Sequence, residues 1–286
     1  MMTSRQSGFT LIELMVSMAI ATVAMLGVSK LYINSQQTSR TQVTQSRLTE
    51  DGRYAISMLK KVISQSGYRP PTAPAFLPSR FTTATSKNMV FQFIADGQNL
   101  IDCAGSIYPK DATKTIAMTI SQVPLSPSDP SKLNCSNAGG VGPTAPVSWL
   151  GDSGTSSVVE DVVFSYGIDE GVPTSFPVTT PPTTRIEDVF LCKKSPTLAL
   201  QRDCVADKYV NAPTAAQMAD IVSVRVCILL RSTLAQNEIL VKATPDKKCS
   251  TYDSAGDEVP GASVDATAAQ RYYYRKFTTT IALQNF

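Results

Sequence analysis

A single carboxylate stands near the start of a long apolar run. Residues 9–29 carry one formal charge, that of Glu13, and a helix of this length spans about 30 Å, the thickness of a bilayer's hydrocarbon core. An acidic side chain at the membrane centre costs about 2.5–3.5 kcal/mol. Glu13 therefore calls either for a position near the headgroups or for a partner of opposite charge.

The position of Gly8 favours the charged partner. A secretory signal places its small-residue cleavage site after the apolar stretch, whereas Gly8 precedes it. Cleavage after Gly8 would remove a polar leader, residues 1–8, and leave the helix on the mature protein. The new amine on Phe9 would be positively charged, because an α-amino group has a pKa of about 8. Glu13 lies one helical turn after Phe9. The positive partner of Glu13 can therefore be the Phe9 amine of the same subunit or that of a neighbouring subunit.

The cysteines indicate an exported protein. The chain has six Cys and no His, which suits an oxidising compartment with three disulfides and removes the commonest general base and zinc ligand. We expect no metal and no cofactor. Six cysteines allow many connectivities, and neighbour pairing is our choice among them. It joins Cys103 to Cys135, Cys192 to Cys204, and Cys227 to Cys249.

Two acidic segments are candidate calcium sites, but solvated turns explain them better. They are Asp169-Glu170-Gly171 and the group Asp253, Asp257 and Glu258. Neither has the alternating ligand spacing of a known calcium loop.

Two further groups could do chemistry or bind ligands. The adjacent carboxylates Glu160 and Asp161 should point to opposite faces of a strand, so they make a poor acid/base pair. The run at residues 272–276 could stack on DNA or sugars. A sheet edge with snorkelling polar ends is the commoner explanation. This run is Tyr272, Tyr273, Tyr274, Arg275 and Lys276.

Composition narrows the function classes. The net charge is +3 and the basic residues are scattered, so no nucleic-acid footprint is indicated. No catalytic constellation appears, and we expect a protein that is not an enzyme.

The elements that position these residues begin with a helix. Residues 34–47 are polar without Pro or Gly, and apolar residues then return at spacings of three and four between Ala55 and Ile63. Gly67 is a good C-terminal cap, and Pro70-Pro71 forbids continuation. We predict one helix over residues 10–66, bent near Gly27 or Gly52 if it bends at all.

Beyond Tyr68 the pattern predicts β-structure, which gives an α+β fold: a long N-terminal helix packed on an antiparallel sheet head. The predicted strands cover residues 88–95, 115–123, 156–166, 219–232 and 272–283, with a return strand at 238–241. Residues 124–148 and 171–184 are predicted to be long loops.

The residues Gly8-Phe9-Thr10-Leu11-Ile12-Glu13-Leu14, followed by an apolar run, resemble the N-terminus of type IV prepilins and type II secretion pseudopilins. The resemblance implies cleavage between Gly8 and Phe9 by a prepilin peptidase and N-methylation of Phe9. It also implies that Glu13 neutralises the N-terminal amine of an adjacent subunit in a filament.

Three further stretches are similar to PilW-type minor pilins, namely residues 51–68, 219–232 and 271–285. The resemblance implies a minor pilin that primes type IV pilus assembly and stays at or near the tip. Its partners would be other minor pilins, the major pilin, the prepilin peptidase, the inner-membrane assembly platform and the membrane itself. No nucleic-acid partner is established.

The expected organisation is a cleaved leader (1–8), a helix (9–66) whose membrane-spanning or filament-core part is about 9–29, and a β-rich head (67–286). The head would lie in the periplasm before assembly and on an extracellular pilus afterwards. The alternative is a pseudopilin at the tip of a type II secretion pseudopilus. A membrane-anchored adhesin or a DNA-uptake module ranks lower.

Overall fold

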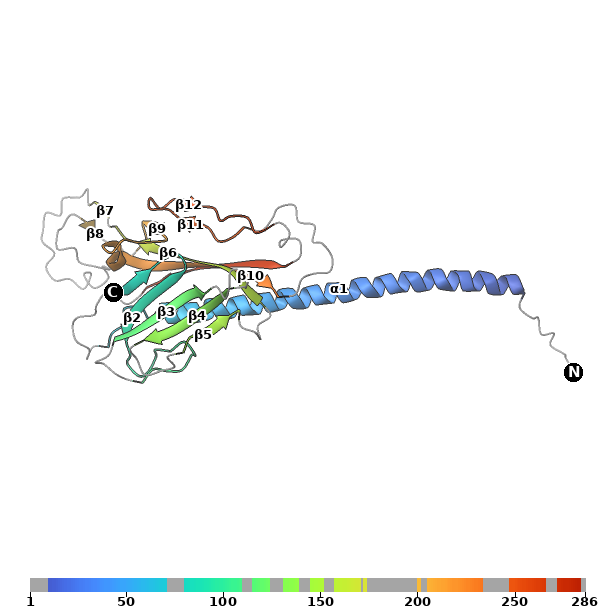
Figure 1. Ribbon diagram of the computed structural model, residues 1–286, viewed down its shortest axis with the longest axis horizontal. Coiled ribbons are helices and arrows are strands. Elements are labelled where there is room, and N and C mark those ends of the chain that lie inside the picture. Colours follow the sequence, from blue (N-terminus) through green and yellow to red (C-terminus); the bar gives the residue numbers. More distant parts are fainter. Residues whose placement is uncertain are drawn as a thin grey trace. The chain divides into compact units, whose positions relative to one another are not determined.

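The computed structural model describes residues 10–70, 80–109, 115–123, 131–138, 145–151, 157–170, 172–173, 200–201, 205–233, 247–265 and 272–283. The chain divides into two compact units, Met1–Ser46 and Arg47–Phe286. A single helix contributes to both units, and all the described strands belong to the second (Figure 1).

Helix α1 runs over Leu11–Ile63, which confirms the predicted long helix. It is long and apolar enough to cross a membrane: its most apolar 18-residue stretch has a mean hydropathy of 2.2, and none of that stretch is buried. The helix ends three residues earlier than predicted because the chain tightens into a turn. There the Ser66 amide bonds the Ile63 carbonyl at 3.0 Å. Gly67 follows at φ 76°, a conformation that favours glycine, and its N–H bonds the Gln92 carbonyl at 2.8 Å.

The first sheet of the head is a five-stranded antiparallel meander. Its order is β1-β2-β3-β4-β5, so every strand pairs with its neighbours along the chain. The strands are β1 (Phe81–Ala84), β2 (Asn88–Ile94), β3 (Thr115–Val123), β4 (Lys132–Ala138) and β5 (Val147–Leu150).

The second sheet pairs strands that are distant in the sequence. Its order is β13-β10-β6-β9, again antiparallel. These strands are β6 (Ser157–Ile168), β9 (Lys208–Val210), β10 (Ile221–Ser232) and β13 (Tyr274–Ala282). A short 3-10 helix, η2 (Gln217–Asp220), leads into β10. Two small ribbons complete the described head: β7 (Val172–Pro173) with β8 (Leu200–Gln201), and β11 (Thr251–Tyr252) with β12 (Glu258–Val259).

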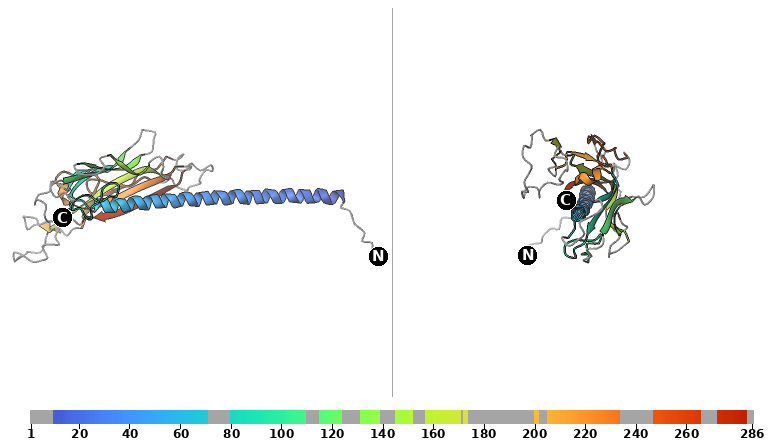
Figure 2. Two further views of the ribbon diagram at one scale, coloured as in Figure 1. Left: turned by 90° about the horizontal axis from the view of Figure 1, so that it is seen from below. Right: turned by 90° about the vertical axis from the view of Figure 1, so that its left-hand side faces the viewer.

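One hydrophobic core joins the last part of α1 to both sheets. Leu59, Val62 and Ile63 of α1 are fully buried in it, together with Phe91 of β2 and Val226 of β10. Figure 2 shows this part of the helix lying along the two sheets. The period-three-and-four stripe read from the sequence is therefore the surface that fixes the helix to the head.

The structure corrects the predicted loop at residues 124–148. This segment contains β4 and the start of β5. The sequence of β4, KLNCSNA, is largely polar, yet Leu133, Cys135 and Asn137 alternate with less buried neighbours in the two-residue period of a strand. The predicted return strand at 238–241 and most of the predicted loop at 171–184 lie outside the described residues. The α+β fold class itself is confirmed.

Candidate functional site

The N-terminal candidate site is centred on Glu13, in the first turn of α1. Gly8 and Phe9 lie outside the described residues. The Glu13 carboxylate accepts hydrogen bonds from the Thr10 amide and the Thr10 hydroxyl, both at 2.9 Å, and the Thr10 hydroxyl faces the Glu13 amide at 3.4 Å. This reciprocal arrangement is a capping box, which satisfies N–H groups at the start of a helix. Glu13 thus caps its own helix, and its carboxylate stays on the exposed surface of the first turn.

The surface around Glu13 is apolar and unburied. Leu11, Leu14 and Met15 are 78%, 52% and 63% exposed. A helix that is apolar on all sides needs lipid or other apolar helices around it, because water is a poor solvent for such a surface. In such an apolar environment, the Glu13 carboxylate would attract a cation strongly.

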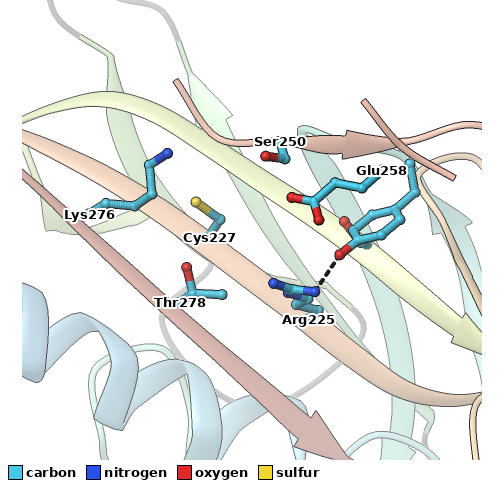
Figure 3. A pocket seen from close by; sticks show the side chains of 8 residues that line it. Arg225, Cys227, Ser250, Glu258, Lys276 and Thr278 are labelled. Atoms are coloured by element: carbon cyan, nitrogen blue, oxygen red, sulfur yellow. Dashed lines mark hydrogen bonds between the residues drawn. The ribbon is translucent and has the colours of Figure 1, made fainter. Parts of the chain in front are cut away.

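A second candidate lies in the head, in a pocket that the sequence did not indicate. It is lined by residues of β6, β10 and β13 and by the segment 247–265, and among them are Arg225, Lys276 and Glu258 (Figure 3). The pattern that could have suggested it is the polar residue at every second position of the apolar strand β10, Ser223 and Arg225, on the face away from the main core.

Two disulfides are present in the head. Cys103 pairs with Cys135, at a Cα–Cα distance of 5.5 Å, and Cys227 with Cys249, at 5.9 Å. Both pairs are those given by neighbour pairing. The remaining predicted pair, Cys192 with Cys204, lies outside the described residues.

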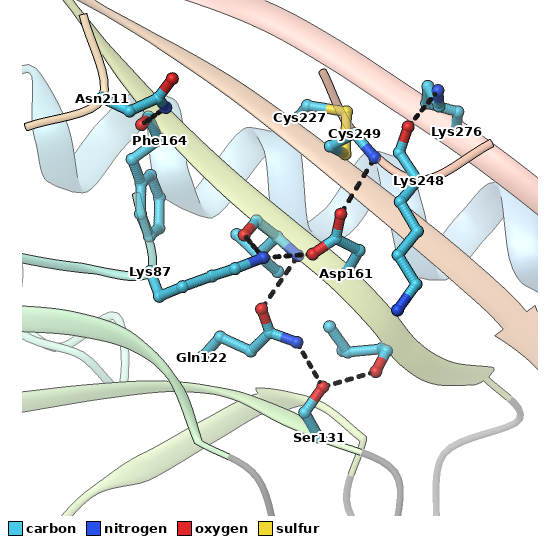
Figure 4. Close-up of polar contacts among 12 residues, drawn as sticks. Lys87, Gln122, Ser131, Asp161, Phe164, Asn211, Cys227, Lys248, Cys249 and Lys276 are labelled. Atoms are coloured by element: carbon cyan, nitrogen blue, oxygen red, sulfur yellow. Dashed lines mark hydrogen bonds and ion pairs between the residues drawn. A yellow bond between two sulfur atoms is a disulfide. The ribbon is translucent and has the colours of Figure 1, made fainter. Parts of the chain in front are cut away.

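The paired carboxylates Glu160 and Asp161 each have a separate structural role. Glu160 accepts a bond from the Arg231 Nε at 3.2 Å. Asp161 forms an ion pair with Lys87 of the β1–β2 turn and accepts the Cys249 amide at 2.9 Å (Figure 4). Asp161 thereby connects the two sheets and the disulfide-bonded segment.

The expectation that Glu160 and Asp161 lie in a regularly alternating strand is wrong. The β6–β10 register shifts opposite Leu229 and Leu230, so β6 has a bulge at this point. As a result Val159 and Val162 both face the main core, which strict alternation forbids. The conclusion that these carboxylates are no acid/base pair still follows from their separate partners.

The acidic segments differ from each other. Asp169 is only 1% exposed, so the prediction of a solvated turn is wrong there, and Glu170 pairs with Lys208 at 2.5 Å. Asp253 holds a tight turn by accepting the amides of residues 255, 256 and 257, each at 2.9 Å. Among the described residues no three of His, Cys, Asp or Glu gather into a group able to hold a metal ion.

The tyrosine-rich run, residues 272–276, overlaps the start of β13, at the edge of the four-stranded sheet. The Arg231 guanidinium lies 4.3 Å from the centre of the Tyr272 ring, and the Arg275 guanidinium lies 5.9 Å from the Phe277 ring. Tyr273 and Phe277 pack against the main core. This run is therefore engaged within the head, as the sheet-edge explanation requires.

Comparison with known proteins gives family matches in two parts of the chain. Residues 156–285 match the family described as Type IV Pilus-assembly protein W, and residues 3–29 match the prokaryotic N-terminal methylation motif. The structure is similar to a type IV-like pilin, TTHA1219, from Thermus thermophilus, with 13% sequence identity and a TM-score of 0.45, over 84% of this chain and 96% of that one. No curated protein sequence matches the chain.

Proposed function

We propose that this chain, a PilW-like type IV minor pilin, primes pilus assembly and occupies a position at or near the pilus tip. The observation that carries the proposal is the joint match of its two ends, the methylation motif over residues 3–29 and the PilW family over residues 156–285. The family and the fold are those of structural pilin subunits rather than of enzymes.

The proposed assembly step is the docking of α1 into a bundle of like helices. The apolar side chains of residues 11–33 are exposed and gain burial in such a bundle. After cleavage between Gly8 and Phe9, and methylation of Phe9, the Glu13 carboxylate of one subunit would pair with the N-terminal amine of its neighbour. The attraction is strong in a low-dielectric bundle, although desolvation of both charges offsets part of it.

The size of the head supports a low-copy position. The second unit contains two sheets with a shared core, and the steric cost of repeating a head along a thin fibre rises with the size of the head. Before assembly, we propose that α1 anchors the chain in the inner membrane with the head in the periplasm. There the prepilin peptidase, the assembly platform, the major pilin and other minor pilins would be its partners.

Replacement of Glu13 tests the proposal. Glu13→Val should insert into the membrane at least as well as the wild type, because it removes a charge from an apolar helix. It should be cleaved at Phe9 yet enter pili poorly. The measurements are immunoblots of sheared-pilus and membrane fractions and mass spectrometry of the mature N-terminus.

A matched control is Ser17→Val, which also removes a polar group from the helix but no charge. The Ser17 hydroxyl bonds the Leu14 carbonyl of its own helix at 2.9 Å. Ser17→Val should enter pili normally. Equal incorporation of Glu13→Val and wild type, at equal membrane levels, would refute the role of Glu13, and a mature protein that retains Arg5 would refute the cleavage.

A further inference from the structure

The outer face of the four-stranded sheet carries a row of polar side chains. In β10, Val224, Val226 and Ile228 belong to the main core, so Arg225 and Cys227 between them face the opposite side. The strand register places Arg225 opposite Ser165 of β6 and Cys227 opposite Thr278 of β13.

The segment 247–265 covers this face and is fixed to it at several points. The Cys227–Cys249 disulfide bonds it to β10. Lys276 of β13 donates from its Nζ to the Lys248 carbonyl at 3.0 Å. Farther along, the Arg225 guanidinium donates to the Tyr252 hydroxyl and lies 5.6 Å from the centre of the Tyr252 ring. The covering segment is therefore held in place on both sides of the space beneath it.

Between the sheet and this segment lies a pocket of about 190 Å³ (Figure 3). A buried water occupies roughly 10–15 Å³ on this measure, so the pocket has room for roughly a dozen non-hydrogen atoms. That is the size of one monosaccharide unit.

The charges that line the pocket favour an anion. Arg225 and Lys276 contribute two positive charges, and Glu258 contributes one negative charge. A guanidinium has five N–H donors in a planar fork that matches a carboxylate. The described partner of Arg225 is the Tyr252 hydroxyl, which occupies only part of that fork.

The remaining lining is rich in hydroxyl groups. Ser165, Thr278 and Ser250 also line the pocket, together with Tyr252. Hydroxyls and the Glu258 carboxylate can exchange hydrogen bonds with the hydroxyls of a sugar, and a tyrosine ring can pack against a sugar's C–H face.

We propose that this pocket binds a small hydroxylated carboxylate, a sugar acid such as one uronic acid unit. Its carboxylate pairs with the Arg225 fork at one end of the pocket, and Lys276 contributes a donor and a positive charge at the other end. Its hydroxyls contact Ser165, Thr278, Ser250 and Glu258. The site is independent of the assembly role of Glu13, since every residue that lines it belongs to the head.

The test uses the purified full-length chain in detergent micelles and glucuronate as the probe. Saturation-transfer NMR observes the ligand, with glucose as the neutral analogue and sulfate as the plain anion. We expect saturable glucuronate binding that exceeds the binding of both analogues. Arg225→Gln and Lys276→Gln should weaken it about tenfold or more, the usual effect of losing a hydrogen bond to a charged group.

The matched control is Arg275→Gln. It makes a similar charge change one residue from Lys276, at a position that faces the main-core side next to Phe277. It should bind glucuronate as the wild type does. Lys276 is exposed, so Lys276→Gln decides the matter even if Arg225→Gln fails to fold.

Three results would overturn the proposal. The first is the absence of saturable glucuronate binding, or equal binding by Lys276→Gln and the wild type. The second is sulfate bound as tightly as glucuronate, which would indicate a general anion site. The third is a glutamate-rich peptide bound more tightly than glucuronate, which would indicate an acidic side chain of another protein as the occupant.

Discussion

The two parts of helix α1 have opposite relations to water, although they belong to one continuous helix. In residues 11–33 the apolar side chains are exposed; Leu26, for example, is 68% exposed. In residues 47–63 the apolar side chains form a stripe that is buried, and Leu48 and Leu59 are 1% and 0% exposed. Both parts contain leucine, so residue type alone does not decide burial.

The arrangement of the apolar residues explains the difference. In the second part, the apolar residues lie along one side of the helix, and charged residues such as Arg53, Lys60 and Lys61 lie on the exposed side. One side therefore packs in a protein core and the other faces water. The first part is apolar on every side, and a folded head can cover only one side of a helix. Its burial has to come from lipid or from other subunits.

Removal of a leucine from each part tests this comparison most strongly. Leu59→Ala should lower the free energy of unfolding of the head by about 2–5 kcal/mol, because it leaves a cavity in the core. Leu26→Ala should leave it unchanged. Trp149, the one tryptophan of the chain, is 4% exposed in β5 and reports unfolding by fluorescence during denaturant titration in detergent. An equal loss in both variants would contradict the division.

The two helix glycines provide a second matched pair. A Cβ at Gly52 would lie 2.2 Å from the Phe277 ring, whereas a Cβ at Gly27 would have nothing within 4 Å. Gly52→Val should therefore destabilise the head by about 1–3 kcal/mol through overpacking, and Gly27→Val should not. The same denaturant titration measures both.

A double variant identifies the cause. Because the strain at Gly52 comes from one ring, Phe277→Ala should cost less in the Gly52→Val background than in the wild type. Strictly additive effects would show that Phe277 is not the source.

The smallest expected effect concerns pH at the point where the chain leaves α1. Burial acts to raise the pKa of Asp96, but hydrogen bonds from the Gln98 amide, the Tyr68 hydroxyl and the Asn99 amide outweigh it and hold the pKa below its usual value. A lowered folded-state pKa stabilises the head above the ordinary pKa of about 3.9, and this stabilisation is lost as the pH falls through the folded-state value. The effect is small because water screens the site.

Asp96→Asn should remove this part of the acid sensitivity. The denaturation midpoint of the variant, measured between pH 6 and pH 2.5, should fall less steeply below about pH 4 than that of the wild type. Tyr68→Phe should act in the same direction, because it removes one of the donors. Identical pH profiles for all three proteins would contradict the assignment.

The sequence predicted the features that depend on periodicity or on strong local signals. The helix, its end near Gly67 and the long strands that became β3, β6 and β10 all carry such signals. The polar strand β4 was missed because hydrophobic periodicity is weak when buried positions are occupied by Cys and Asn.

The site residues show the same limit. Glu13 could be singled out because a charge in an apolar run is a local anomaly. The pocket around Arg225 has only a weak local signal, the alternating Ser223 and Arg225 of β10, because the pocket depends on the register between β6, β10 and β13 and on the segment that crosses above them. Likewise, the bulge that places Val159 and Val162 on one side has no local sequence signal.

The strand order also limits the order in which the two sheets of the head can form. The pairing of the meander β1–β5 needs no residue beyond Leu150, so this sheet can form, and its Cys103–Cys135 bond can close, before the rest of the head has folded. The second sheet must wait for β13, whose final residues are among the last described. Until then β10 has an unpaired edge, and Cys227 meets Cys249 late. The head therefore folds in two stages: the five-stranded meander can form early from neighbouring strands, and the four-stranded sheet is completed only when β13 pairs with β10.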